Sequence, residues 1–300
     1  MPKRSGPLSG FPTRSPFELR LGRFRLCLGR ETKIMGVLNV TPDSFSDGGE
    51  YLDPGLAEAR ALRMQEEGAH LIDVGGESTR PGSRAVAARE EIRRIRPVLK
   101  RLAKKIQLPV SVDTYKPEVA AAALDEGAVL INDIRALKNN RLTARRIARY
   151  KAGVALMHMR GTPRTMQSKT RYRDVAAEVG RELASAAKDA LEAGIDRRSV
   201  LVDPGFGFAK TAAQNLQLLA RLDRFADLGF PVLAGLSRKS FLAPLTGAAV
   251  NDRLYGSLGA AAAAIYGGAH MLRVHDVLAH RHLAGVIDGT LGEREWTFSR

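Results

Sequence analysis

Polar side chains come directly after several short apolar runs in this chain of 300 residues, and Asp113, Asn132 and Asp203 are three of them. If the runs are strands of one parallel sheet, these side chains point into a common opening, where buried polar groups need hydrogen-bond partners. Each residue also stands near an expected helix start, where Asp and Asn are common caps. Three such residues aimed at one opening favour a bound heterocycle with several N–H and C=O groups.

A second set of side chains is suited to an anionic ligand. Arg80 offers a planar guanidinium fork and Thr79 a hydroxyl, although a single arginine is also typical of a surface salt bridge. The segment 237–240 places two cations and two hydroxyls at the expected start of a helix, where the helix dipole favours an anion. An anionic ligand is the simplest explanation of this pattern.

The first and last apolar runs also end in polar residues. Alternation along the last strand puts Arg273 and His275 on one face while Val274 faces away. The first run, 34–38, is followed by Asn39 and a long polar loop, and such loops are usually functional. Asn39 together with a diphosphate could hold Mg²⁺, because that ion keeps most of its waters and takes few protein ligands.

Eight apolar runs of strand length alternate with longer helical patterns, which predicts a parallel α/β sheet. Eight such units in about 260 residues match a (β/α)8 TIM barrel, whose active site lies at the C-terminal ends of the strands. The runs are 34–38, 69–74, 109–112, 128–131, 154–157, 200–202, 231–234 and 269–274, and the clearest helical patterns are 54–67, 89–105, 117–126, 172–193 and 215–227. Gly68, Gly127, Gly194 and Gly268 each stand where a helix should end, a position that tolerates left-handed backbone.

We expect a single barrel domain over residues 31–300, preceded by a basic, loosely packed extension over residues 1–30 that contains four prolines. Alternation within 17–28 allows a small hairpin across one end of the core. The single cysteine, Cys27, excludes an intramolecular disulfide framework. Because no leader pattern and no apolar run of roughly 20 residues is present, we expect a cytoplasmic protein without a membrane span.

The formal net charge of +15 raises the question of a nucleic-acid partner. The basic residues of 93–105 share their helical pattern with apolar positions 92, 95, 99, 102 and 106 on the opposite face, which is typical of a solvated helix surface. The charge therefore favours solubility and the steering of an anionic small substrate over nucleic-acid binding.

The sequence resembles one family, the dihydropteroate synthases of the pterin-binding TIM barrels. The resemblance covers about residues 33–290 and rests on eight motifs in order: GVLNVTPDSFSDGG (36–49), IDVGGESTRPG (72–82), SVDT (111–114), IND (131–133), MHMRG (157–161), DPGFGF (203–208), SRKSF (237–241) and RVHD (273–276). Eight ordered motifs make chance agreement negligible.

The resemblance implies a transferase that joins (7,8-dihydropterin-6-yl)methyl diphosphate to p-aminobenzoate in folate biosynthesis, releasing diphosphate and 7,8-dihydropteroate. It also implies Mg²⁺ as cofactor, small-molecule substrates without a nucleic-acid or membrane partner, and a homodimer. Loss of diphosphate leaves a delocalised pterin cation, which requires anion binding at the leaving group and negative charge near the ring. Asp113 and Asp203 can supply that negative charge.

The same resemblance implies a role for each matching residue. The pterin diphosphate would be bound by Thr79, Asp113, Asn132, Met157, Asp203, Phe208, Gly235, Lys239, Arg273, Val274 and His275. The p-aminobenzoate would contact Phe45, Thr79, Arg80 and Ser237, and Mg²⁺ would be held by Asn39. Asp47, Arg80 and Lys239 would be catalytic, with Asp47 stabilising cationic charge as the C–O bond breaks. Asn39 would be fixed at the rim, whereas 45–49 would be a mobile flap.

The chain departs from the family pattern at two places. Ala209 stands where the family usually has a third glycine, and Arg135-Ala136-Leu137 replaces the usual small residues. Two other functions remain open. A methyltetrahydrofolate:corrinoid methyltransferase shares the Asp and Asn pterin ligands but has no diphosphate to bind. A non-catalytic pterin-binding paralogue would be expected to have degraded first and second loops, and these are intact.

Overall fold

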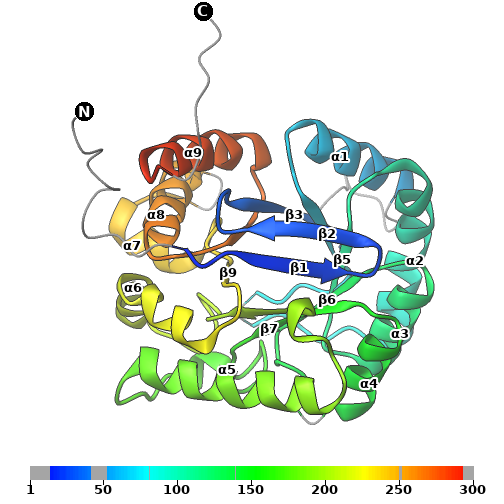
Figure 1. Ribbon diagram of the computed structural model, residues 1–300, viewed down its shortest axis with the longest axis horizontal. Helices are drawn as coiled ribbons and strands as arrows, with labels where there is room; N and C mark the ends of the chain where they lie inside the picture. The colour runs from blue at the N-terminus through cyan, green and yellow to red at the C-terminus, as the bar shows by residue number, and fades with distance from the viewer. Residues whose placement is uncertain (1–13, 42–52, 81, 139, 250–251, 293–300) are drawn as a thin grey trace, which may run out of the picture.

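The computed structural model describes residues 14–41, 53–80, 82–138, 140–249 and 252–292, in which parallel strands are surrounded by helices (Figure 1). In chain order the strands and helices of the barrel are β3 (Lys33–Asn39), α1 (Pro54–Glu66), β4 (Leu71–Gly75), α2 (Ala88–Lys105), β5 (Val110–Asp113), α3 (Pro117–Asp125), β6 (Leu130–Asp133), α4 (Arg141–Arg149), β7 (Gly153–Met157), α5 (Val175–Glu192), β8 (Val200–Asp203), α6 (Ala212–Ala220), β9 (Leu233–Ala234), α7 (Ala243–Thr246), α8 (Leu254–Tyr266), β10 (Met271–Val274) and α9 (Val277–Thr290). Short 3-10 helices η2 to η5 occupy Met166–Ser168, Arg197–Ser199, Leu222–Leu228 and Ser240–Leu242.

The eight barrel strands pair in parallel in the order β8-β7-β6-β5-β4-β3-β10-β9. A parallel bridge between Val202 of β8 and Val232, next to β9, joins the two ends of this sheet. The (β/α)8 barrel that the sequence predicts is therefore confirmed. The single helix expected over 215–227 is two elements in the structure. The helix α6 begins at a Thr211–Gln214 capping box and ends at Ala220, and the 3-10 helix η4 follows it.

Left-handed glycines end the helices at the four repeated junctions. The φ angles are +90° at Gly68, +94° at Gly127, +97° at Gly194 and +96° at Gly268. A residue with a Cβ is strained in this conformation, whereas glycine adopts it readily. The predicted helix ends are thus confirmed, and each one turns the chain back into the next strand.

Two apolar cores lie on the two sides of the barrel wall. Every second strand residue packs outward against the helices, as Ile34, Ile72 and Val154 do. The residues between them point into the barrel, where a separate cluster contains Met35, Leu71, Leu130, Ala155, Leu201, Leu233 and Met271. Because side chains alternate along a strand, the polar residues two positions further on share this inward face.

The hairpin expected within 17–28 is present as β1 (Phe17–Leu21) and β2 (Phe24–Leu28). It crosses one end of the barrel in front of the strands (Figure 1), and its Leu19, Leu21 and Leu28 complete the inner cluster. The described residues 14–30 are therefore not loosely packed. Their apolar side chains shield the apolar layer inside the barrel from water at this end. The domain boundary at residue 30 stays a prediction.

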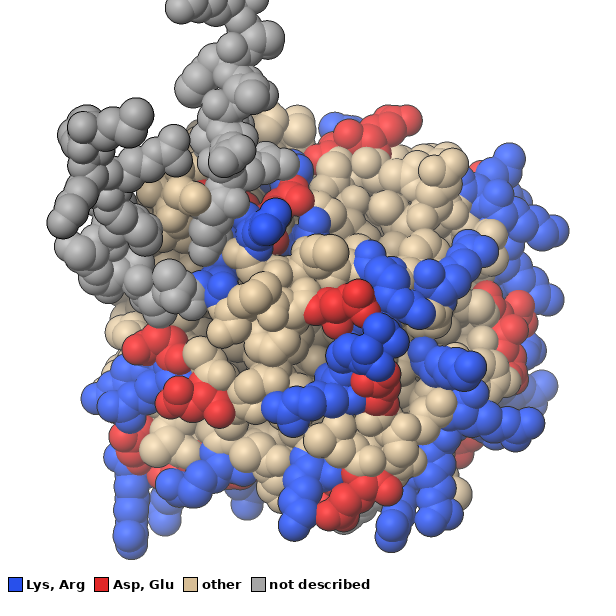
Figure 2. All heavy atoms as spheres, viewed as in Figure 1, with Lys and Arg blue, Asp and Glu red and all other residues tan. Residues whose placement is uncertain are grey.

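Charged side chains of both signs are interspersed on the face seen in Figure 2. On α2, the basic residues Arg93 and Arg94 pair with Glu90, and Arg101 pairs with Glu58. This surface is a solvated face with short ion pairs, as its spacing predicts. Among the described residues, no helix combines the length and the apolar character that crossing a membrane requires.

Candidate active site

Four side chains from four strands converge at the C-terminal mouth of the barrel. Arg273 Nε donates to Asp73 Oδ2 at 2.6 Å, and its Nη2 donates to Asp113 Oδ2 at 2.7 Å. Asn132 Nδ2 donates to the same Asp73 oxygen at 3.0 Å. We call Asp73, Asp113, Asn132 and Arg273 the mouth cluster. It brings together Asp113 and Asn132, two of the three residues that the sequence places at one opening, with Arg273 of the last strand.

The mouth cluster leaves buried acceptors without partners. Asp73 Oδ1, Asp113 Oδ1 and Asn132 Oδ1, with the hydroxyl of Ser111 below them, make no hydrogen bond in the described part of the chain. Leaving a buried acceptor unsatisfied costs roughly 1–3 kcal/mol. A native protein tolerates several such atoms in one place when a ligand supplies the donors.

The alternative role of these residues as helix caps is wrong for two of them. The N-cap of α3 is Lys116 and that of α4 is Asn140, so Asp113 and Asn132 cap neither helix. Asp203 differs, because one carboxylate oxygen accepts the backbone N–H of Gly205 at 2.7 Å in a local turn. Its other oxygen remains directed toward Gly235, where a Cβ would lie 3.9 Å from it.

Burial dominates the electrostatics of the mouth. It raises the pKa of Asp113 to about 7, against the opposing effect of Arg273 and with a further upward contribution from Asp73. It also raises the pKa of Asp203. Burial works against the positive charge of Arg273, but the Asp73 and Asp113 carboxylates outweigh it, and the guanidinium pKa rises. The cluster holds a permanent cation and a carboxyl that titrates near neutrality.

Two buried apolar side chains and a lysine lie beside the mouth cluster, and we call them the apolar wall. Met157 and Phe208 belong to one buried group above the barrel interior, and Lys239 Nζ lies 4.2 Å from the centre of the Phe208 ring. Burial, followed by the nearby Arg273, lowers the pKa of Lys239 to about 8. The slot between Phe208 and the mouth cluster therefore combines a flat apolar surface with a cation that can lose its proton.

A hydroxyl and an imidazole define the side of the mouth at β9 and β10. Ser237 Oγ accepts the backbone N–H of His275 at 3.2 Å and lies 3.0 Å from its Nδ1, to which it can donate. Burial, with Arg273 and Arg238, lowers the pKa of His275 to about 3, so its imidazole is neutral at pH 7. His275 is therefore a hydrogen-bonding group and not a second cation.

The anion site expected over residues 237–240 needs correction. Arg238 does not join Lys239 in an anion site, because its guanidinium pairs with both oxygens of Asp276 at 3.1 and 2.6 Å. The segment leads into η5 and the four-residue α7, too short to present a strong helix dipole. Val274 packs in the outer core, so any contact with a ligand is left to its backbone.

The first two loops begin at the rim of the mouth. Asn39 ends β3 opposite Gly75, half-buried, and its Oδ1 would lie 3.5 Å from a Cβ on that glycine. Thr79 is half-buried and Arg80 exposed on the loop after β4. Phe45 and Asp47 lie outside the described residues, so the mobile flap stays a prediction.

Two residues at the site received no role from the sequence. Asp73 accepts from both Arg273 and Asn132 at the centre of the cluster, and its position two residues after the inward-facing Leu71 is the signal that identifies it. Lys210 is 3% exposed behind the Phe208 wall. No sequence pattern marks that lysine as buried, because it follows a glycine-rich turn with no strand or helix period.

Comparison with known proteins agrees with this geometry. The family model for pterin binding enzymes matches residues 35–275. The dihydropteroate synthase of Escherichia coli strain K12 is 45% identical over 263 residues, covering 87% of this chain and 93% of that protein.

Two solved structures of the Xanthomonas albilineans dihydropteroate synthase have the same fold. The one with 4-aminobenzoic acid has a TM-score of 0.83 and 47% identity over 91% of this chain and 98% of that one. The one with 7,8-dihydropteroate has a TM-score of 0.79 and 45% identity over 90% and 98%. The chain belongs to the pterin-binding enzymes, in the dihydropteroate synthase family.

Proposed function

We propose that the chain condenses (7,8-dihydropterin-6-yl)methyl diphosphate with p-aminobenzoate, giving 7,8-dihydropteroate and diphosphate. The observation that carries this proposal is the set of unpartnered acceptors on Asp73, Asp113 and Asn132. A pterin ring presents an amino group and ring N–H donors in one plane, which matches acceptors that converge on a single opening. The structures of relatives that contain 4-aminobenzoic acid and 7,8-dihydropteroate support the two ends of the reaction.

The pterin ring would lie between the mouth cluster and the apolar wall. Asp113 and Asn132 would accept from its amino group and ring N–H, and Asp203 would accept from the opposite edge. Lys239 would donate to the ring carbonyl, and Gly235 leaves room beside it because it has no side chain. Met157 and Phe208 would cover the flat face.

The reaction breaks the bond between the pterin methylene carbon and the diphosphate oxygen, and the electron pair leaves with diphosphate. The buried carboxylates of Asp113 and Asp203 would stabilise the resulting cation. Arg273, the backbone at Val274, and neutral His275 would bind the leaving diphosphate from β10. The amine of p-aminobenzoate then forms the new C–N bond and loses a proton to solvent.

We propose that Mg²⁺ would bind at the rim of the mouth, shared between Asn39 and the diphosphate. Asn39 offers one amide oxygen there, and Mg²⁺ bound to a diphosphate needs few protein ligands. When bound, the ion would neutralise charge on the diphosphate. Among the described residues there is no group of three or more His, Cys, Asp or Glu that could hold a metal ion.

The aminobenzoate would bind on the loop side of the mouth. Ser237 and Thr79 would offer hydroxyls, and the exposed fork of Arg80 suits the carboxylate. Phe45 would pack on its ring, and Asp47 would stabilise the cationic transition state; both belong to the first loop. We also propose a cytoplasmic location and a homodimer, with residues 1–30 as an extension of the barrel domain.

A turnover assay with both substrates and Mg²⁺ tests the proposal. The intact protein should form dihydropteroate, and it should release diphosphate from the pterin substrate even without p-aminobenzoate, because the cation can form before the amine attacks. Asp113→Ala should lose turnover by about 100-fold or more. Absence of product from the intact protein, with the variant indistinguishable from it, would overturn the assignment.

A further inference from the structure

Lys210 is a buried lysine with a complete set of acceptors. Its Nζ donates to the carbonyls of Gly205 and Phe208, both at 3.0 Å, and lies 3.2 Å from His158 Nδ1. An ammonium has three donors and no acceptor. Three acceptors around Nζ therefore satisfy the charged form, and they place the lone pair of the His158 imidazole on Nδ1.

A polar chain continues from this lysine to the surface. Burial, followed by the charge of Lys210, lowers the pKa of His158 to about 4, so the neutral ring carries its proton on Nε2, 3.2 Å from Glu182 Oε2. Arg160 in turn donates to Glu182 and Glu178 and lies 4.0 Å above the Tyr172 ring.

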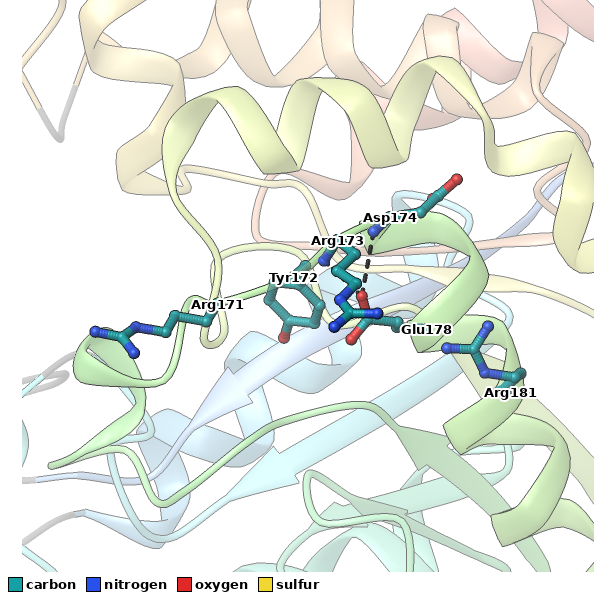
Figure 3. A pocket seen from close by; sticks show the side chains of 6 residues that line it. All are labelled: Arg171, Tyr172, Arg173, Asp174, Glu178 and Arg181. Atoms are coloured by element: carbon teal, nitrogen blue, oxygen red, sulfur yellow. Dashed lines mark hydrogen bonds between the residues drawn. The ribbon is translucent and has the colours of Figure 1, made fainter.

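The outer end of this chain borders a surface hollow. Tyr172 and Glu178 line a hollow of about 630 Å³ at the start of α5, together with three arginines and Asp174 (Figure 3). Two contacts of Lys210 thus go to the turn, and the third, to His158, begins the chain of paired groups that leads to the surface.

The turn that Lys210 holds has unusual backbone geometry. The φ angles are +72° at Gly205, +81° at Gly207 and +51° at Ala209. A Cβ on Gly205 would lie 2.0 Å from the carbonyl oxygen of His158, so the two segments touch through their backbones. Glycine adopts positive φ readily, whereas an alanine such as Ala209 does so only where the surroundings impose it. By donating to the carbonyls of Gly205 and Phe208, Lys210 links two residues of this turn.

We propose that Lys210 is a positioning residue for pterin binding. By holding the carbonyls of Gly205 and Phe208, it sets the Phe208 ring and the Lys239 ammonium that lies on it. The same turn begins with the Asp203 carboxylate, which accepts from Gly205 N. The inference rests on the proposed function, because it assigns Phe208, Lys239 and Asp203 to the pterin side of the mouth.

The first test is Lys210→Met, which keeps the length of the side chain and removes the donors. Pterin affinity, followed by the intrinsic fluorescence of 6-hydroxymethylpterin, should weaken about 10-fold, equivalent to about 1.4 kcal/mol, because Phe208 and Lys239 lose the support of two carbonyl contacts. The KM for p-aminobenzoate should change by less than about 3-fold. Lys188→Met, an exposed lysine on α5, is the matched control and should leave both values unchanged.

Two further readouts separate positioning from general support of the fold. Burial lowers the pKa of Lys210 to about 7, and the charged groups that face it are Asp203, Glu182, Arg160 and Lys239. Because deprotonation removes the charge and one of the three donors of Lys210, the affinity ratio of intact protein to Lys210→Met should be larger at pH 6 than at pH 9, and it should stay above one because the neutral amine can still donate to both carbonyls. His158→Asn keeps an acceptor near Nδ1 and should bind pterin better than His158→Leu.

A structural role alone would lower the melting temperature without these effects. A folded Lys210→Met protein that binds 6-hydroxymethylpterin as tightly as the intact protein, or an affinity ratio that is constant with pH, would overturn the inference. Because the pterin titration needs no turnover, it stays informative if the intact protein makes no dihydropteroate. That second result would count against the proposed function and not against the role of Lys210.

Discussion

An arginine paired with buried aspartate occurs at both ends of the barrel, but the two ion pairs differ in whether the carboxylates are fully satisfied. At the hairpin end, Arg14 and Asp288 form a buried ion pair at 2.7 Å, and Thr32 donates its backbone N–H and its hydroxyl to the same carboxylate. At the mouth, Arg273 also pairs with buried carboxylates, but one oxygen of Asp73 and one of Asp113 have no partner among the described residues.

This difference separates stability from function along the barrel axis. A buried ion pair whose partners are satisfied locally has nothing left to offer a ligand, whereas unsatisfied acceptors cost free energy until a ligand binds. The hairpin end can therefore be a structural closure, and the mouth a binding surface that remains destabilised when empty. Mutations at the two ends should affect different measurable quantities.

The largest expected effect is on stability and comes from the hairpin end. Arg14→Met leaves the Asp288 carboxylate buried without its cation and should lower the free energy of unfolding by about 3–5 kcal/mol. The kcat/KM of the molecules that remain folded should change by less than about 2-fold, because Arg14 donates to Thr32, Ala269 and Asp288 at the end of the barrel opposite the mouth. Urea unfolding and steady-state kinetics measure the two quantities.

Arg30→Met is the control for that prediction. Arg30 is exposed just after β2, so its loss should change the free energy of unfolding by less than about 0.5 kcal/mol. If Arg14→Met reduced kcat/KM as strongly as it reduced stability, the two ends would be coupled and the division along the barrel axis would be wrong.

The next effect is on activity and comes from the mouth. Asp113→Asn keeps the shape of the side chain but replaces a charged acceptor that faces the ligand, so kcat/KM should fall about 100-fold, equivalent to about 2.7 kcal/mol. The stability of the unliganded protein at pH 7 should stay equal or increase, because a buried charge beside Asp73 is removed. A large loss of stability would show that the mouth also supports the fold.

The pH dependence of stability gives a smaller effect at the same residue. Because burial raises the pKa of Asp113 to about 7, the folded chain binds this proton more tightly than the unfolded chain, where Asp titrates near about 3.9. The stability from this group is complete below that unfolded value and is lost as pH rises through about 7. Asp113→Asn should therefore gain stability relative to the intact protein between pH 5 and pH 8.

Urea unfolding of both proteins across that range measures the gain. Lys210 and Lys239 also titrate near this range, since burial lowers their pKa values to about 7 and about 8. Their contribution has the opposite sign and is largely common to both proteins, so it largely cancels in the difference. A difference that is constant with pH would mean that Asp113 stays ionised throughout.

Sequence patterns predict the barrel well because each of its rules is local. Short apolar runs predict the strands, and Gly68 and Gly127 predict the helix ends, because both patterns depend only on neighbouring residues. Asp113 and Asn132 are predicted by a local rule too, because each is a polar residue at the end of an apolar run.

The rest of the site depends on contacts between distant segments. Arg238 and Lys239 are neighbours in sequence, yet Arg238 pairs with Asp276 whereas Lys239 lies on Phe208. Burial of Lys210 and the packing of the hairpin likewise arise only after the barrel closes. Tertiary contacts therefore decide which of several cations serves the ligand.

The smallest prediction concerns Ala209, a left-handed residue in the turn before Lys210. Ala209 has a φ of +51° and no exposed surface, so its Cβ is held in a left-handed conformation that costs an alanine about 1 kcal/mol or more. Ala209→Gly removes that strain but adds freedom to the unfolded chain, and the net gain in stability should be about 0.5 kcal/mol. Scanning calorimetry should detect a rise in Tm of a few degrees or less.

Ala184→Gly supplies the contrast, because Ala184 is exposed in the middle of α5, where glycine should cost about 1 kcal/mol. The two alanine-to-glycine changes should thus shift Tm in opposite directions. If both lowered it, the left-handed turn before Lys210 would hold its conformation without strain at Ala209.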